Sequence, residues 1–143
     1  MREILFRGKT LTNKGWVCGL LTDIGIDEKE SVAFVSGIMV HKSTVGQYTG
    51  LTDKNGKKIF EGDIVKNDWC FGCGYSVIKF GQYKPLDMSG EYQQGHLGFY
   101  LEHLHEADKR SVRKDVLYFA NKCEIIGNIH DNPELLGGDN NAN

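Results

Sequence analysis

Hydrophobic residues in this chain occur in short runs separated by polar or glycine-containing stretches, a pattern typical of many short β-strands. Runs at 4–6 and 16–21 flank a polar stretch with Gly15, which predicts an opening β-hairpin. The mostly polar segment 23–31 is expected to form a loop or a short helical turn. The apolar run 32–40 is interrupted by a glycine, which predicts one strand with a bulge.

The centre of the chain carries the clearest turn signal. The dipeptide Asn55-Gly56 tolerates the positive φ angles of a type I′ turn. It lies between Gln47-Tyr48-Thr49 and Ile59-Phe60, so we expect a β-hairpin or a loop closed by a tight turn. A second turn is expected at 61–63.

After these turns, strands are expected at 64–66 and 75–80. A Gly-Asp-Ile-Val strand followed by a Val-Ile-Lys-Phe strand is similar to the pattern of small SH3-like barrels. Pro133, with an N-cap residue before it, predicts a single helical turn. The remaining expectations are a mobile loop at 81–95, strand or helix at 96–104, a charged, solvated helical turn or loop at 106–115, strands at 116–119 and 123–129, and a disordered tail at 137–143.

Composition agrees with one globular domain. The chain has 143 residues, of which 40% are hydrophobic and 25% charged, enough for a core without disulfides or metal. Eighteen glycines against two prolines favour frequent turns. The formal charge of -2 lacks the basic excess of a strong non-specific nucleic-acid binder, although a local basic face remains compatible with it.

No apolar run reaches the length of a signal-peptide core or a membrane-spanning helix, so a cytoplasmic location without a membrane partner is expected. The four cysteines are accordingly expected to be free thiols. They are Cys18, Cys70, Cys73 and Cys123.

Three blocks of the sequence resemble the YopX-like family of phage and prophage proteins. They are Arg2 to Arg7, Gln47 to Val65, and Glu124 to Ile129 followed by Asn132 to Leu135. The middle block is long and specific, and the blocks keep their order along the chain. The resemblance implies a mostly-β domain with a small barrel, an origin in a phage or prophage and a bacterial host cell. It implies no activity, and it helps least over 70–115, which is long and idiosyncratic.

A metal site is one candidate chemistry. Cys70 and Cys73 have the spacing of half a zinc knuckle, and His103 and His105 would add imidazoles on one face of a strand. A strong zinc signal needs two paired motifs, and only one is present. The simpler interpretation is two reduced thiols on a glycine-containing turn and two surface histidines, so no cofactor is expected.

Hydrolysis is a second candidate. Asp53, Glu61 and Asp63 lie close in sequence and would provide paired carboxylates for acid–base work or a divalent ion. Such residues also build turns, since their side chains accept hydrogen bonds from nearby backbone N–H groups. We favour the turn interpretation and expect no enzymatic activity.

Nucleic-acid binding is a third candidate. Lysines cluster near two aromatic residues, an arrangement in which small barrels stack bases beside a basic groove. The condition is that Tyr48 is exposed; otherwise the rings pack in the core and the lysines solvate a hairpin. The residues proposed for binding are Gln47, Tyr48, Thr49, Lys54, Lys57, Lys58 and Phe60.

Protein binding is the fourth candidate and the leading one. The chain has more large rings than one small core readily hides, and aromatic residues are enriched at interfaces. The rings in question are Trp16, Trp69, Phe71, Tyr75, Phe99 and Tyr100.

The sequence therefore predicts a mostly-β domain over 1–136, with N-terminal strands at 1–45, a small SH3-like β-barrel at 46–136 and short helical turns. We expect a phage or prophage accessory protein that contacts a protein partner, including a second copy of itself. The alternatives are a nucleic-acid-binding small barrel and a metal-binding protein.

Overall fold

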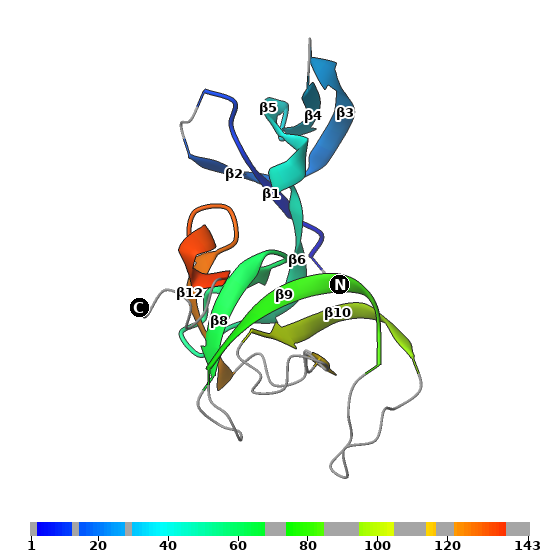
Figure 1. The fold of residues 1–143 in the computed structure, drawn as a ribbon. Coiled ribbons are helices and arrows are strands. Elements are labelled where there is room, and N and C mark those ends of the chain that lie inside the picture. Colours follow the sequence, from blue (N-terminus) through cyan, green and yellow to red (C-terminus); the bar gives the residue numbers. More distant parts are fainter. Residues whose placement is uncertain are drawn as a thin grey trace. The chain divides into compact units, whose positions relative to one another are not determined.

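The structure is a computed structural model that describes residues 3–12, 15–27, 30–67, 74–84, 95–104, 114–116 and 122–136. These residues form antiparallel strands almost throughout (Figure 1), which confirms the mostly-β prediction. The chain divides into two compact units, Met1–Gly50 and Leu51–Asn143. Each is described by itself below.

The first unit contains the first part of a four-stranded sheet and all of a three-stranded sheet. The orders are β2-β1-β6-β7 and β3-β4-β5. Strand β6 begins in this unit, where it pairs with β1, and ends in the second unit, to which β7 belongs. The elements are β1 (Phe6–Lys9), β2 (Trp16–Gly19), β3 (Leu21–Asp27), β4 (Glu30–Val35), β5 (Ile38–His41), the 3-10 turn η1 (Lys42–Thr44) and β6 (Gly46–Thr52).

The predicted opening hairpin is present as β1 and β2, antiparallel from the pair Phe6/Gly19 to the pair Lys9/Trp16. One face of this hairpin lies against the core of the first unit, where Gly8 approaches the side chain of Val40 closely. Val17, directly opposite Gly8, packs against the same core. The buried centre of that core is Ala33, Val35 and Val40.

Two expectations for the first unit were wrong. The segment 23–31 is not a loop or helical turn, because β3 and β4 run through it as an antiparallel pair. The run 32–40 is not one bulged strand but two strands joined at Ser36 and Gly37, whose φ angles are 52° and 78°. Positive φ at both central positions is the signature of a tight two-residue hairpin. Val35 and Ile38 consequently face each other across it.

The second unit holds a five-stranded antiparallel sheet with the order β11-β10-β9-β8-β12. Strand β9 pairs with β8 as predicted. Among the described residues β11 and β12 do not pair with each other, so the sheet stays open and the SH3-like barrel is not confirmed. The strands are β7 (Lys58–Phe60), β8 (Asp63–Asn67), β9 (Gly74–Tyr83), β10 (His96–His103), β11 (Lys114–Val116) and β12 (Glu124–Asn128).

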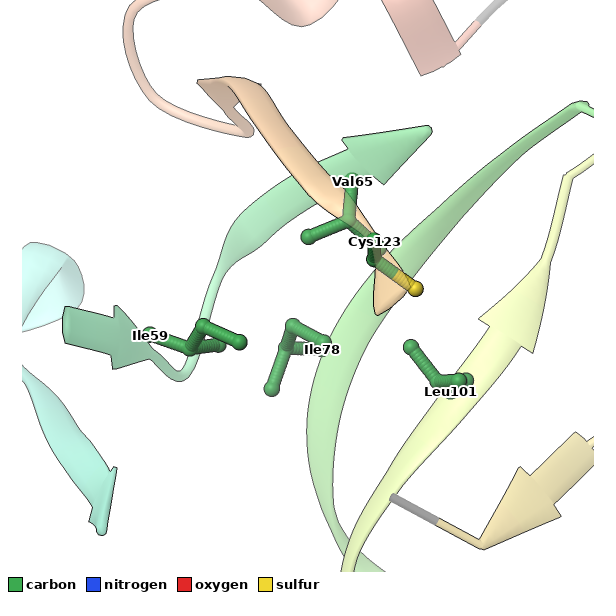
Figure 2. Close-up of a cluster of buried hydrophobic side chains, with 5 residues drawn as sticks. All are labelled: Ile59, Val65, Ile78, Leu101 and Cys123. Atoms are coloured by element: carbon green, nitrogen blue, oxygen red, sulfur yellow. The ribbon is translucent and has the colours of Figure 1, made fainter. Parts of the chain in front are cut away.

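The core of the second unit gathers residues that are far apart in sequence (Figure 2). Ile78 pairs directly with Leu101, so both side chains lie on one face of the sheet. Val65 pairs with Ser76, which lies two residues before Ile78 and therefore on the same face. Burying each large aliphatic side chain contributes about 1.5–3 kcal/mol. The fully buried members are Ile59, Val65, Ile78, Leu101 and Cys123.

The other expectations for this unit have mixed outcomes. The ambiguous segment 96–104 is a strand over most of its length, and the last predicted strand corresponds to β12. Residues 133–136 form the expected short helical turn, of the 3-10 type. Strand β9 extends into the segment expected to be a loop. Most of 81–95 and of 106–115, and all of 137–143, lie outside the described residues.

A glycine substitution tests the packing of the first unit. Gly8→Ala would place a Cβ atom 2.6 Å from Val40 Cγ2 and 2.9 Å from Val40 Cβ. Because Val40 is fully buried, it has little room to move, and we expect a loss of about 2 kcal/mol in unfolding free energy. Urea unfolding followed by circular dichroism measures it.

Gly25→Ala is the matched control, since a Cβ there meets nothing within 4 Å. It should leave stability unchanged or slightly raised, because alanine loses less backbone entropy on folding. Equal stabilities for the two variants would contradict the close approach at Gly8.

Candidate functional site

The lysine-bearing turn of the second unit is built on Asp53. The Gly56 N–H donates to the Asp53 carbonyl at 3.0 Å, and the Asp53 N–H donates to the Lys57 carbonyl at 2.8 Å. Gly56 has a φ of 83°, whereas Asn55 is not among the described residues with positive φ. The turn is therefore a tight one as expected, but not type I′, which requires positive φ at both central residues.

The Asp53 carboxylate accepts three backbone hydrogen bonds. Its Oδ1 atom accepts from the N–H groups of Asn55 and Lys57, each at 2.9 Å. Its Oδ2 atom accepts from the Ile125 N–H at 3.0 Å, across 72 positions of sequence. The side chain is 4% exposed. One carboxylate therefore closes the turn and ties it to β12.

These partners determine the protonation of Asp53. Burial raises the pKa of the carboxyl group, but the three backbone donors and the charge of Lys57 together lower it by more. The pKa consequently lies below the ordinary value of 3.8. An acid–base catalyst working near neutral pH needs the opposite shift.

Asp63 has a comparable role in the second predicted turn. Its Oδ2 atom accepts from the Phe60 N–H at 2.8 Å, and its side chain is 2% exposed. The turn itself is present, with Gly62 at a φ of 93° and its N–H donating to the Ile78 carbonyl. Both buried aspartates bind backbone, which supports the turn interpretation of the carboxylate cluster over the hydrolytic one.

The residues proposed for binding fall into an exposed set and a set with little exposure. The lysines at positions 54, 57 and 58 are exposed on or beside the Asp53 turn, and Lys54 lies 3.7 Å from Glu124. Gln47, Tyr48 and Thr49 belong to the first unit, and Phe60 belongs to the second. Gln47 is half-buried, and the other three are 7–8% exposed.

This burial bears on the base-stacking hypothesis. The hypothesis requires an exposed Tyr48 ring, but Tyr48 is only 8% exposed, and Phe60 is equally buried at 7%. Stacking on a base requires an open ring face. The three lysines stay a predicted contact surface, without these two rings as its platform.

Of the four proposed metal ligands, the structure describes only His103. Its ring is 7% exposed, and its Nδ1 atom lies 3.0 Å from the hydroxyl of the fully buried Ser76. It is therefore not the surface histidine of the simpler interpretation. Cys70, Cys73 and His105 lie outside the described residues. Within the part of the chain that is described, no three potential ligands gather around a metal position.

An exposed apolar surface on β9 and β10 is the feature that sequence reasoning missed. Phe80 pairs directly with Phe99, and Leu97 lies one pair further along the same face as Ile78 and Leu101. The rings of Phe80 and Phe99 meet edge to face, with centroids 5.0 Å apart. Phe80 is 51% exposed and Leu97 is 70% exposed. We call Phe80, Leu97 and Phe99 the β9–β10 apolar end.

The signal for this surface was present in the sequence as the alternation of Leu97, Phe99 and Leu101. The interface hypothesis named Phe99 together with Tyr100. Since neighbouring residues of a strand point to opposite faces, the two rings separate, and Tyr100 stacks with Tyr83 at 4.7 Å between centroids. Tyr100 is 7% exposed and therefore does not belong to an open surface.

The role of Asp53 is tested by Asp53→Asn. The substitution keeps the size of the side chain but replaces one acceptor oxygen with an NH2 donor, which then faces a backbone N–H. We expect a loss of about 2–3 kcal/mol in unfolding free energy at pH 7. Asp131→Asn is the control, because the exposed Asp131 carboxylate accepts a hydrogen bond from the Asn128 side chain at the surface, and its replacement should cost less than about 1 kcal/mol.

The lowered pKa predicts how the effect of Asp53→Asn depends on pH. The ionised carboxylate stabilises the fold fully above the pKa of the unfolded chain, near 4, and this stabilisation falls as the pH decreases through the lower pKa of the folded state. The stability gap between wild type and Asp53→Asn should therefore stay constant between about pH 5 and 7 and shrink below about pH 4. Urea titrations at several pH values measure it; a gap of the same size at pH 3 and pH 7 would contradict the assignment.

Three comparisons relate the chain to known proteins. The crystal structure of protein EF1440 from Enterococcus faecalis is similar over 95% of this chain and 99% of that chain, with 25% sequence identity and a TM-score of 0.48. The comparison with curated proteins finds no match. Among the described residues, no helix has the length and hydropathy needed to cross a membrane. The family model for the YopX protein matches residues 21–137, most of the sequence, and the chain belongs to the YopX family.

Proposed function

We propose that this YopX-family protein is a non-enzymatic protein-interaction module and that it associates through the β9–β10 apolar end. The observation that carries the proposal is the exposure of Phe80 and Leu97 on the face that elsewhere forms the core of the second unit. A large ring and a leucine left open to water are costly for a monomer, at roughly 25 cal/mol for each Å² of apolar surface. A partner that covers them recovers this free energy.

The ion pair between β9 and β10 lies on the face opposite to the β9–β10 apolar end, which favours an apolar partner for that end. Lys79 and Glu102 form an ion pair at 2.7 Å, and both lie on the opposite face of the two strands. The pair directly beside Phe80 and Phe99 on the apolar face is Gln82 and Leu97, which carries no charge. An uncharged apolar patch is complementary to its own copy, as a two-fold symmetric interface requires.

The first occupant that we propose is therefore a second copy of the chain. The interface would place Phe80 and Leu97 near its centre, where aromatic and large apolar residues contribute most to binding. The same proposal includes the phage or prophage origin implied by the sequence resemblance, with the protein acting as an accessory factor through protein contacts. The lysines of the Asp53 turn are not needed for it.

Leu97→Ser tests the proposal. Sedimentation velocity over a concentration series should show a monomer–dimer equilibrium for wild type and a dissociation constant raised at least about 10-fold for the variant, because a central apolar contact is lost. Leu136→Ser is the matched control, since Leu136 is also exposed, at 42%, and lies outside the two strands. It should dimerise like wild type.

Strictly monomeric wild type at high concentration would remove the second copy as the occupant. A dimer equally stable in wild type and Leu97→Ser would place the interface elsewhere. Circular dichroism of Leu97→Ser shows whether the variant has folded, so a loss of the dimer is not mistaken for a loss of the fold.

A further inference from the structure

The Asp53 turn, residues 53–57, contains a dipeptide with a chemistry of its own. Asn55 is followed by Gly56, and no other asparagine in the sequence is followed by glycine. The Asn55 side chain is exposed. Gly56 carries no side chain, and where its Cβ atom would lie no atom beyond its chain neighbours comes within 4 Å. The side-chain amide of Asn55 and the peptide nitrogen of Gly56 therefore adjoin at an uncrowded position.

These two groups are the reactants of deamidation, the reaction that makes asparagine a thermolabile residue. The Gly56 nitrogen loses its proton and attacks Cγ of Asn55, so that an N–Cγ bond forms and the Cγ–Nδ2 bond breaks. Nδ2 takes up a proton and leaves as ammonia. Water then opens the cyclic imide, giving aspartate if it adds at Cγ and isoaspartate if it adds at the main-chain carbonyl carbon. Water is the one co-reactant that the reaction needs.

The hydrogen bonds of the turn oppose the first step. The Gly56 N–H donates to the Asp53 carbonyl at 3.0 Å, and it must leave this acceptor before the nitrogen can attack. The N–H groups of Asn55 and Lys57, on either side, both donate to Oδ1 of Asp53 at 2.9 Å. Asp53 therefore holds three successive peptide groups. Attack requires the turn to open locally, so its rate depends on how often the turn opens.

We propose that Asn55 is a site of spontaneous deamidation and that the Asp53 turn sets the rate of this modification. Isoaspartate places one additional carbon atom in the main chain between residues 55 and 56, which moves the N–H groups of Gly56 and Lys57 away from Asp53. A buried carboxylate that loses donors destabilises the fold. Because the reaction is irreversible, the weakened fraction of the second unit grows with the age of the protein. This modification does not depend on the proposed self-association.

Peptide mapping measures the reaction. Cleavage after glutamate releases residues 31–61, in which Asn55 is the one asparagine. Mass spectrometry of this peptide detects the conversion of the amide to a carboxylate, and an isoaspartate-specific methyltransferase labels the isoaspartyl product. We expect deamidation of the folded protein at a rate at least about 10-fold lower than in guanidinium chloride, because the closed turn is the dominant state. The rate should rise with pH, since the attacking nitrogen must lose its proton.

Two variants separate opening of the turn from unfolding of the unit. Asp53→Ala removes the acceptor of the flanking N–H groups and should speed deamidation of the folded protein by about 5-fold or more. Ile78→Val is the matched control, because it removes one methyl group from the fully buried core of the same unit and leaves the turn intact. It should deamidate like wild type.

Hydrogen exchange keeps the test informative even if Asp53→Ala does not fold. Exchange of the Gly56 N–H in the wild-type protein measures the open fraction of the turn directly. The deamidation rate of the folded protein should equal the rate of the unfolded chain multiplied by this fraction.

Aged protein tests the consequence of the modification. Wild type that carries isoaspartate should unfold at a lower urea concentration than fresh protein. Asn55→Gln is the matched control, since it keeps the amide but forms the larger cyclic imide far more slowly. Its unfolding midpoint should stay constant over the same incubation.

Four results would overturn the proposal. Unmodified Asn55 in the folded protein, after the unfolded chain has fully converted, would exclude the site. Equal rates in the folded and unfolded protein would exclude control by the turn. Acceleration in Ile78→Val as large as in Asp53→Ala would assign the rate to unfolding of the whole unit. An unchanged unfolding midpoint of the isoaspartyl protein would exclude the loss of stability.

Discussion

The fold of the second unit depends on the buried Asp53 carboxylate. One oxygen closes the turn that begins at Asp53, and the other holds Ile125 at the start of β12. The Lys54 N–H adds a second link, donating to the Cys123 carbonyl at 2.9 Å. Cys123 is part of the core and Ile125 packs against it, so the hydrogen bonds and the apolar packing keep the same edge strand in place. If the Asp53 side chain lost one of its two acceptor oxygens, a buried backbone N–H would be left without an acceptor. This cost explains why an ionised side chain is kept at a buried position.

Local signals in the sequence were sufficient for the turns and insufficient for their partners. Gly56 and Gly62 were correctly placed in turns because each needs a positive φ that glycine adopts without strain. The type I′ assignment was wrong because it considered only Asn55 and Gly56. The turn also depends on Asp53, two positions before Asn55, whose side chain accepts hydrogen bonds from the backbone of the turn. The bond from Ile125 to Asp53 joins residues 72 positions apart and has no local signature at all.

Burial was the property that residue types predicted least well. The polar composition of 23–31 indicated a loop, yet β3 and β4 form an antiparallel pair there. Strand β3 lies at one edge of its sheet, and Asp23 and Ile24 are exposed on it. Polar residues are tolerated at such an edge. Counting aromatic rings suggested an excess over what one core hides, but the rings named for it did not include Phe80, which is 51% exposed. This exposure follows from register: Phe80 faces Phe99 beyond the last fully buried pair, Ile78 and Leu101.

Whole-chain charge illustrates the same limitation for function. A net charge of -2 argues against a nucleic-acid binder only if the charges are evenly mixed over the surface. Here the acidic Asp53 and Asp63 are buried and bound to backbone N–H groups, so they contribute less to the surface potential than their number suggests. Conversely, Arg7 and Lys9 both lie beside the Trp16 ring, so two positive charges occur together on one short hairpin. Since an exposed charge acts over about one Debye length, roughly 8 Å at physiological salt, the potential at any point of the surface is set by the charges near that point and hardly by the sum over 143 residues.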